Sequence, residues 1–261
     1  MPYANNNGVK IHYETDGQGP PLVLQHGMTQ TLRSWYDSGY VDGLKADYRL
    51  ILVDARGHGQ SDKPHDPQAY ELKTRVGDIL AVMDDAGVDK AHYMGFSLGG
   101  RIGFGIAMHA LDRFHSLIIG GMSALPSLDA FDPQQQANLL LKGMEAYVSE
   151  AETREGPLPA DRKAMLLAND SAALAASILS PRGTDGIENL LPKLNIPCLL
   201  YCGDADGFYA GSKESSRLIP NAIFATIPGL DHGQTSRAGD QVLPHVTKFL
   251  TTVTDKAGAV R

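Results

Sequence analysis

The chain has 261 residues and a formal net charge of −7, from 23 Lys and Arg against 30 Asp and Glu. This acidic balance argues against a nucleic-acid partner, because phosphate binding needs a basic face. No apolar run approaches the roughly 18 residues that a membrane span requires. Residues 1–7 lack the features of a secretory signal, and Cys198 and Cys202 fall in one predicted strand, too far apart to bridge each other. We therefore expect a cytoplasmic protein that contacts neither nucleic acid nor membrane.

Short apolar, β-branched runs alternate with longer segments of helical period, a pattern typical of a mostly parallel sheet. The short runs predict strands at 9–13, 22–25, 48–53, 91–94, 116–119, 198–201 and 222–227. The longer segments predict helices at about 31–47, 69–86, 98–111, 211–219 and 238–252. The predicted strands are nearly all apolar, as expected where helices cover both faces of a sheet.

The interval between residues 121 and 196 carries no strand signal. Segments 133–150 and 160–180 look like amphipathic helices, separated by a joint rich in Pro and Gly. A structureless loop of that length would be improbable in a compact domain. We predict a helical cap at 125–185, a core formed by 1–124 and 186–253, and a disordered tail at 254–261.

A nucleophile candidate lies at Gly95-Phe96-Ser97-Leu98-Gly99, directly after a predicted strand and at the start of a predicted helix. A serine at such a sharp turn needs positive φ, and the residues two positions to either side must be small. The turn pushes the hydroxyl out of the sheet. It also leaves the backbone N–H of Leu98 at a helix N-terminus, where it can stabilise an oxyanion.

A serine nucleophile needs a base, and the base needs an acid that orients it. Of the nine histidines, His232 follows the last predicted strand, in what we predict to be a loop. Chemistry in sheet enzymes is often placed in such loops. The acid should follow the preceding strand, where both Asp204 and Asp206 occur. We favour Asp206 because it lies further into the loop, and Asp204 stays open as the alternative.

The second oxyanion donor is expected after an earlier strand, at Gln25-His26-Gly27-Met28. Gly27 allows the backbone to turn tightly, so that the N–H of Met28 can face the nucleophile. His26 is interpreted as a structural residue.

These motifs together resemble the α/β-hydrolase superfamily over nearly the whole chain. The likeness rests on His26-Gly27, Asp54-x-Arg56-Gly57-x-Gly59-x-Ser61-Asp62, Gly95-x-Ser97-x-Gly99, Gly203-x-x-Asp206 and Asp231-His232-Gly233, in that order. The expected fold is α/β: a mostly parallel, twisted, eight-stranded sheet flanked by helices, with a small helical cap inserted after the sixth strand. The resemblance also implies a Ser-Asp-His triad of Ser97, Asp206 and His232, because the family's acid is usually the last residue of a Gly-x-x-Asp tetrad.

Within this superfamily the chain looks like the small-capped serine esterases, the enol-lactone hydrolases and the cofactor-free haloperoxidases or perhydrolases. Dehalogenases and most epoxide hydrolases of the fold have an Asp nucleophile and commonly Pro after His-Gly, whereas this chain has Ser97 and Met28. We expect a carboxylic ester hydrolase (carboxylesterase or lactonase) that forms an acyl-enzyme on Ser97. The alternatives are a perhydrolase or haloperoxidase, a C–C bond hydrolase, or a small-molecule receptor of slow turnover.

Substrate contacts are expected from four large apolar side chains: Trp35, Phe96, Met144 and Phe208. For any one residue of the cap, packing of the cap on the sheet is the more frequent role of such a side chain. Three arginines could bind a carboxylate on a lactone substrate: Arg154, Arg162 and Arg182. No metal and no organic cofactor is expected. The expected partner is a small-molecule ester or lactone, and a homodimer stays open.

Overall fold

Eight strands form one sheet, in a computed structural model that describes residues 2–125, 132–181, 183–184 and 186–258. In chain order they are β1 (Tyr3–Asn6), β2 (Val9–Asp16), β3 (Pro21–Gln25), β4 (Arg49–Val53), β5 (Ala91–Phe96), β6 (Phe114–Gly120), β7 (Cys198–Gly203) and β8 (Ile223–Ile227). Their order across the sheet is β1-β2-β4-β3-β5-β6-β7-β8. The β1–β2 and β2–β4 pairings are antiparallel, and all the others are parallel. The expected fold class is confirmed, with β1 added to the strands that the apolar runs predicted.

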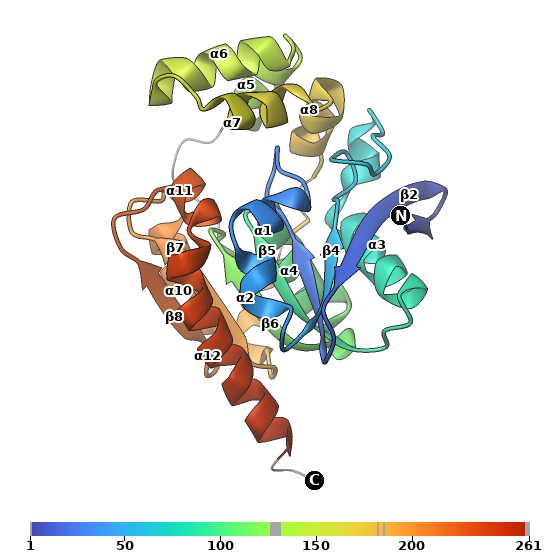
Figure 1. The fold of residues 1–261 in the computed structure, drawn as a ribbon, viewed down its shortest axis with the longest axis vertical. Helices are drawn as coiled ribbons and strands as arrows, with labels where there is room; N and C mark the ends of the chain where they lie inside the picture. The colour runs from blue at the N-terminus through green and yellow to red at the C-terminus, as the bar shows by residue number, and fades with distance from the viewer. Residues whose placement is uncertain (1, 126–131, 182, 185, 259–261) are drawn as a thin grey trace.

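Helices cover both faces of the sheet (Figure 1). One face carries α1 (Arg33–Asp37), α2 (Tyr40–Leu44) and α12 (Gly239–Gly258). The other carries α3 (Leu72–Asp85), α4 (Leu98–His109), α9 (Ile187–Leu190) and α10 (Tyr209–Leu218). Side chains alternate between the two layers, so that Leu22 and Leu24 of β3 join the first and Val23 joins the second. This two-sided burial explains why the central strands β3, β4 and β7 are mostly apolar, whereas the edge strand β1 and its neighbour β2 carry several polar residues.

The remaining helices are α5 (Pro133–Leu140), α6 (Met144–Glu155), α7 (Ala160–Leu167), α8 (Ser171–Leu179) and α11 (His232–Arg237), with 3₁₀ helices η1 (Pro67–Tyr70), η2 (Leu111–Arg113) and η3 (Leu191–Lys193). In the part of the chain that the structure describes, no helix combines the length and the apolar character needed to cross a membrane.

Three of the long predicted helices are broken in the structure. The predicted helix 31–47 divides into α1 and α2 at Gly39, whose φ of +77° ends one helix and starts the next. The predicted helix 133–150 divides into α5 and α6 at Gly143, where φ is +102°. The predicted helix 160–180 divides before α8, where the Asp170 carboxylate accepts a hydrogen bond from the N–H of Ala173. The periodicity of apolar residues runs through these breaks, so it did not reveal them.

The end of the chain also differs from expectation. Helix α12 continues to Gly258, so residues 254–258 of the predicted disordered tail are helical. Residues 259–261 lie outside the described part of the chain.

Helices α5–α8 form a separate layer between β6 and β7 in the sequence, which we call the cap. Figure 1 shows them together at one end of the molecule, beyond the α11 end of the core. The cap has its own apolar clusters, one of which includes Leu140, Met144 and Leu174. Met28 of the core packs against this cluster, and the Asn169 amide donates to the carbonyl of Thr29 at 3.0 Å. The cap therefore contacts the loop after β3 directly.

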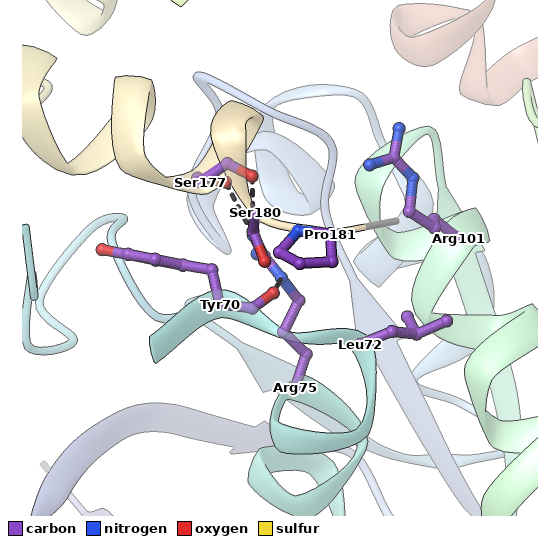
Figure 2. Close-up of a pocket in the computed structure, with 7 residues that line it drawn as sticks. All are labelled: Tyr70, Leu72, Arg75, Arg101, Ser177, Ser180 and Pro181. Atoms are coloured by element: carbon purple, nitrogen blue, oxygen red, sulfur yellow. Dashed lines mark hydrogen bonds between the residues drawn. The ribbon is translucent and has the colours of Figure 1, made fainter. Parts of the chain in front are cut away.

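Arg75 on α3 holds the C-terminal end of the cap helix α8 (Figure 2). Arg75 is 4% exposed, and its guanidinium donates to the hydroxyl and the carbonyl of Ser177, at 2.7 and 3.3 Å, and to the carbonyl of Tyr70 at 2.8 Å. The last carbonyls of a helix lack intrahelical partners and favour a nearby cation. At the other end of α8, His65 Nε2 lies 3.0 Å from the Asp170 carboxylate. Core side chains thus contact both ends of this helix.

Burial of neutral histidines makes the stability of the fold depend on pH. Burial lowers the pKa of His26 and His58, and burial together with the nearby His115 lowers that of His92 to about 4. The unfolded chain binds these protons near pH 6.5 and the folded chain does not. The stabilisation is therefore complete above pH 6.5 and is lost as the pH falls toward 4, on the order of 3 kcal/mol for His92 alone.

We expect the free energy of unfolding, measured by urea denaturation, to fall steeply between pH 6.5 and pH 4.5. A His92→Gln variant should make this fall shallower, because one of the three buried histidines with a lowered pKa is gone while His26 and His58 remain. The matched control is His245→Gln, at an exposed position on α12, which should leave the slope unchanged. A slope in His92→Gln equal to that of the unsubstituted protein would contradict the assignment.

Candidate active site

Ser97 lies at a sharp turn between β5 and α4. Its φ is +54° and its ψ is −108°, and its N–H donates to the carbonyl of Gly120 at 2.9 Å. A Cβ on Gly95 would collide with the carbonyl of Gly99, and a Cβ on Gly99 would collide with the carbonyl of Gln25. Both glycines are therefore required for the turn to pack on the sheet, as the motif predicts.

His232 is the first residue of α11 and not a loop residue as the sequence suggested. Asp231 caps this helix: its carboxylate accepts from the N–H of Gln234 at 2.7 Å, and the Gln234 side chain accepts from the N–H of Asp231 at 3.0 Å. This reciprocal pair satisfies two backbone donors and fixes the start of the helix. The backbone that carries the imidazole is thereby held at a defined place.

The structure brings Ser97, His232 and Asp206 together. His232 Nε2 lies 2.9 Å from Ser97 Oγ, and His232 Nδ1 lies 2.7 Å from Asp206 Oδ2. The three residues follow β5, β8 and β7, whose carboxyl ends share one edge of the parallel sheet. Both ring nitrogens are therefore within hydrogen-bond distance of the partners that general-base activation of a hydroxyl requires.

Asp206 is held in place by several donors. It is 6% exposed, the N–H of Phe208 donates to its Oδ1 at 2.9 Å, and the Cys202 thiol lies 3.4 Å from its Oδ2. Burial raises the pKa of Asp206, but the hydrogen bonds and the charge interaction with His232 outweigh it, and the net shift is downward. The carboxylate is therefore ionised at neutral pH. The alternative acid, Asp204, instead accepts a hydrogen bond from the N–H of Gly229 at 2.6 Å, so its side chain stabilises the loop before α11.

Two of the expected substrate contacts pack against the imidazole. The ring of Phe96 lies 5.0 Å from the ring of His232, and that of Phe208 lies 5.4 Å from it. Phe96 is 3% exposed, whereas the His232 side chain is 37% exposed. The two aromatic rings therefore restrict the orientation of the imidazole, and contact of either with substrate stays a prediction.

The other expected substrate contacts lie in apolar cores. Trp35 is 4% exposed and packs edge-to-face on Tyr40, with 4.9 Å between ring centroids. Met144 is 5% exposed within the cap cluster. Both positions correspond to core packing, so their contact with substrate also stays a prediction. Arg154 and Arg162 each form an ion pair with Glu155 at 2.7 Å, and Arg182 lies outside the described residues.

The loop after β3 runs alongside the nucleophile. A Cβ on Gly27 would lie 3.3 Å from the Cβ of Ser97, so only glycine allows this approach without displacement. Met28 follows on the same loop, and Leu98 is the first residue of α4, where the helix supplies no carbonyl for its N–H. Both expected oxyanion donors are thus on segments next to Ser97.

His26 has a structural role. The N–H of Ala55 donates to its Nε2 at 3.1 Å, and its Nδ1 lies 2.7 Å from the carbonyl of Gly27. Since a backbone N–H can only donate, Nε2 is the acceptor and Nδ1 carries the proton. Burial lowers the pKa of His26. The neutral ring connects two strand ends, as the sequence interpretation expected.

One residue at the site was missed from the sequence. Gln30 bonds both to Gly27 and to Ser236 of α11, at 3.0 and 3.2 Å. No motif marks Gln30, because its contact with Ser236 joins segments about two hundred residues apart in the sequence.

Comparison with known proteins agrees with this geometry. The family model of the alpha/beta hydrolase fold matches residues 20–186, and the chain belongs to this family. The enol-lactonase from Burkholderia xenovorans LB400 is 25% identical with a TM-score of 0.81, over 96% of this chain and 100% of that chain. The bromoperoxidase from Bacillus anthracis is also 25% identical with a TM-score of 0.81, over 96% and 99%. 3-Oxoadipate enol-lactonase 1 of Acinetobacter baylyi is 24% identical over 214 residues, which is 78% of each chain. The resemblance expected from the motifs is confirmed.

Proposed function

We propose that the protein is a serine hydrolase that cleaves a carboxylic ester or lactone of a small molecule through an acyl-enzyme on Ser97. One observation carries this proposal: the two ring nitrogens of His232 lie within hydrogen-bond distance of Ser97 Oγ and of the Asp206 carboxylate, at 2.9 and 2.7 Å. Such a hydrogen-bonded series makes the serine hydroxyl a nucleophile at neutral pH.

The first half of the reaction forms the acyl-enzyme. Ionised Asp206 accepts from Nδ1–H of His232, which leaves Nε2 free to accept the proton of Ser97 Oγ. The oxygen attacks the carbonyl carbon, and the N–H groups of Met28 and Leu98 stabilise the resulting oxyanion. When the tetrahedral intermediate collapses, His232 gives its proton to the leaving alkoxide and the C–O bond breaks. For a lactone the leaving oxygen stays attached to the acyl chain.

The second half releases the acid. His232 takes a proton from a water molecule, and the resulting nucleophile attacks the acyl carbon. The same two N–H groups stabilise the second tetrahedral intermediate. Ser97 Oγ then leaves and recovers its proton from His232. The two enol-lactonases among the similar proteins support a lactone as the substrate class.

A perhydrolase is the second candidate, because a bromoperoxidase matches this chain as well as an enol-lactonase does. In that reaction hydrogen peroxide replaces water in the second half, so an acyl-enzyme yields a peracid. This candidate would be favoured if the protein forms peracid from acetate and hydrogen peroxide at a higher rate than it hydrolyses esters. A C–C bond hydrolase or a slow receptor remains an outcome of the substrate tests.

We expect a fluorophosphonate probe to label Ser97 and to abolish turnover in proportion to labelling, because the probe reacts with an activated serine hydroxyl. The labelled residue is identified by mass spectrometry of peptides. With p-nitrophenyl acetate, a hydrolase should turn over repeatedly, whereas a receptor should give one burst followed by retention of product. Labelling at another serine, with turnover intact, would overturn the proposal.

A further inference from the structure

The turn that carries Met28 is closed by the side chain of Gln30. The N–H of Gln30 donates to the carbonyl of Gly27 at 3.3 Å, and the N–H of Gly27 donates to Gln30 Oε1 at 3.0 Å. Between them, Thr29 has a φ of +64°, a conformation that β-branched residues rarely adopt. The hydrogen bond from Gly27 to the Gln30 side chain therefore stabilises a turn that Thr29 itself disfavours.

Gln30 also connects this turn to the helix that begins at His232. A backbone N–H can only donate, so Gln30 presents Oε1 to Gly27 and Nε2 to Ser236. Nε2 donates to Ser236 Oγ at 3.2 Å, and that hydroxyl donates to the carbonyl of Gly233 at 2.8 Å. Each group in this chain of bonds has a partner of the correct polarity. The chain ends at the residue directly after His232.

We propose that Gln30 is a positioning residue that fixes the Met28 N–H relative to Ser97 by tying its turn to α11. The inference rests on the proposed function. A Cβ on Gly27 would lie 3.1 Å from Gln30 Oε1 as well as 3.3 Å from the Cβ of Ser97, so the turn sits against both residues. Without Gln30 the turn can move while the contacts among the triad residues stay intact. Oxyanion stabilisation depends steeply on donor distance and angle, so the loss falls on the transition state.

We expect Gln30→Met to lower kcat by about 10- to 100-fold and to change KM by less than about 3-fold. Inhibition by a trifluoromethyl ketone, which forms a tetrahedral adduct with the serine, should weaken by the same factor as kcat/KM. A purely structural role would not produce this parallel. The matched control is Gln68→Met, at an exposed position on η1. This variant should leave kcat, KM and inhibition by the trifluoromethyl ketone unchanged.

Ser236→Ala removes the hydrogen bond between Gln30 Nε2 and Ser236 Oγ, and it keeps both hydrogen bonds between Gly27 and Gln30. It should give a smaller loss of kcat in the same direction, and the double variant should lose no more than Gln30→Met alone, because both changes break one chain. If Gln30→Met does not fold, Ser236→Ala carries the test. Wild-type kcat in Gln30→Met would overturn the inference. If Ser236→Ala carries the test, wild-type kcat in that variant would do the same. A loss of kcat without weaker binding of the ketone inhibitor would also overturn it. Failure of the proposed function shows separately, as turnover that survives in Ser97→Ala.

Discussion

Replacing Ser97 with alanine is expected to lower kcat for an activated ester by a factor of about 10⁴ to 10⁶. The change removes the only atom that can form the acyl-enzyme in the proposed mechanism. It leaves His232, Asp206 and both oxyanion donors in place, so some acceleration over water should remain. The measurement is steady-state hydrolysis of p-nitrophenyl acetate by purified protein, with the fluorophosphonate probe as a titrant.

The control for this variant is Ser149→Ala, at an exposed position on α6, which should retain wild-type turnover. Thermal melting should be nearly the same for all three proteins, since alanine keeps the Cβ that packs at the turn. Wild-type turnover in Ser97→Ala would show that another group performs the reaction. The proposed mechanism would then be wrong at its first step.

Replacing Asp206 with asparagine is expected to lower kcat by a factor of about 10⁴. An asparagine amide can donate to His232 Nδ1, which places the ring proton on Nε2, where it faces Ser97. In that tautomer the imidazole cannot accept the serine proton. Steady-state kinetics across a range of pH measure the loss, which should not be recovered at any pH where the protein is folded.

Asp204→Asn is the matched comparison, since the two carboxylates lie in the same loop. Its amide oxygen can still accept from the N–H of Gly229, which Asp204 contacts at 2.6 Å. We expect kcat to stay within a few-fold of wild type. The opposite pattern, with Asp204→Asn inactive and Asp206→Asn active, would assign the acid to the other residue.

The residues proposed for catalysis could be found from the sequence because each follows a strand of the parallel part of the sheet. Ser97, Asp206 and His232 come after β5, β7 and β8, and the carboxyl ends of parallel strands meet at one edge. The sequence alone does not separate Asp204 from Asp206, because the conformation of the turn decides where residues two apart in a loop point. Here Asp204 faces Gly229 and Asp206 faces the imidazole.

Other features of the site had no signal in the sequence. Trp35 and Met144 are large apolar side chains, and such residues show the same pattern whether they face a core or a ligand. The helix breaks at Gly39 and Gly143 occur where the backbone takes a positive φ, and an apolar period continues across them. Gln30 acts through a contact with Ser236 that exists only once the chain has folded.

Among the described residues that are not glycine, four have a positive φ: Asn7, Thr29, Ser97 and Asn221. Asparagine tolerates this conformation, but threonine and serine do not, and such residues each cost on the order of 1–3 kcal/mol. Glycine at position 29 or 97 should therefore give a more heat-resistant protein. A directed-evolution campaign that rewards thermostability alone would tend to erase activity, so each round needs a selection for turnover as well.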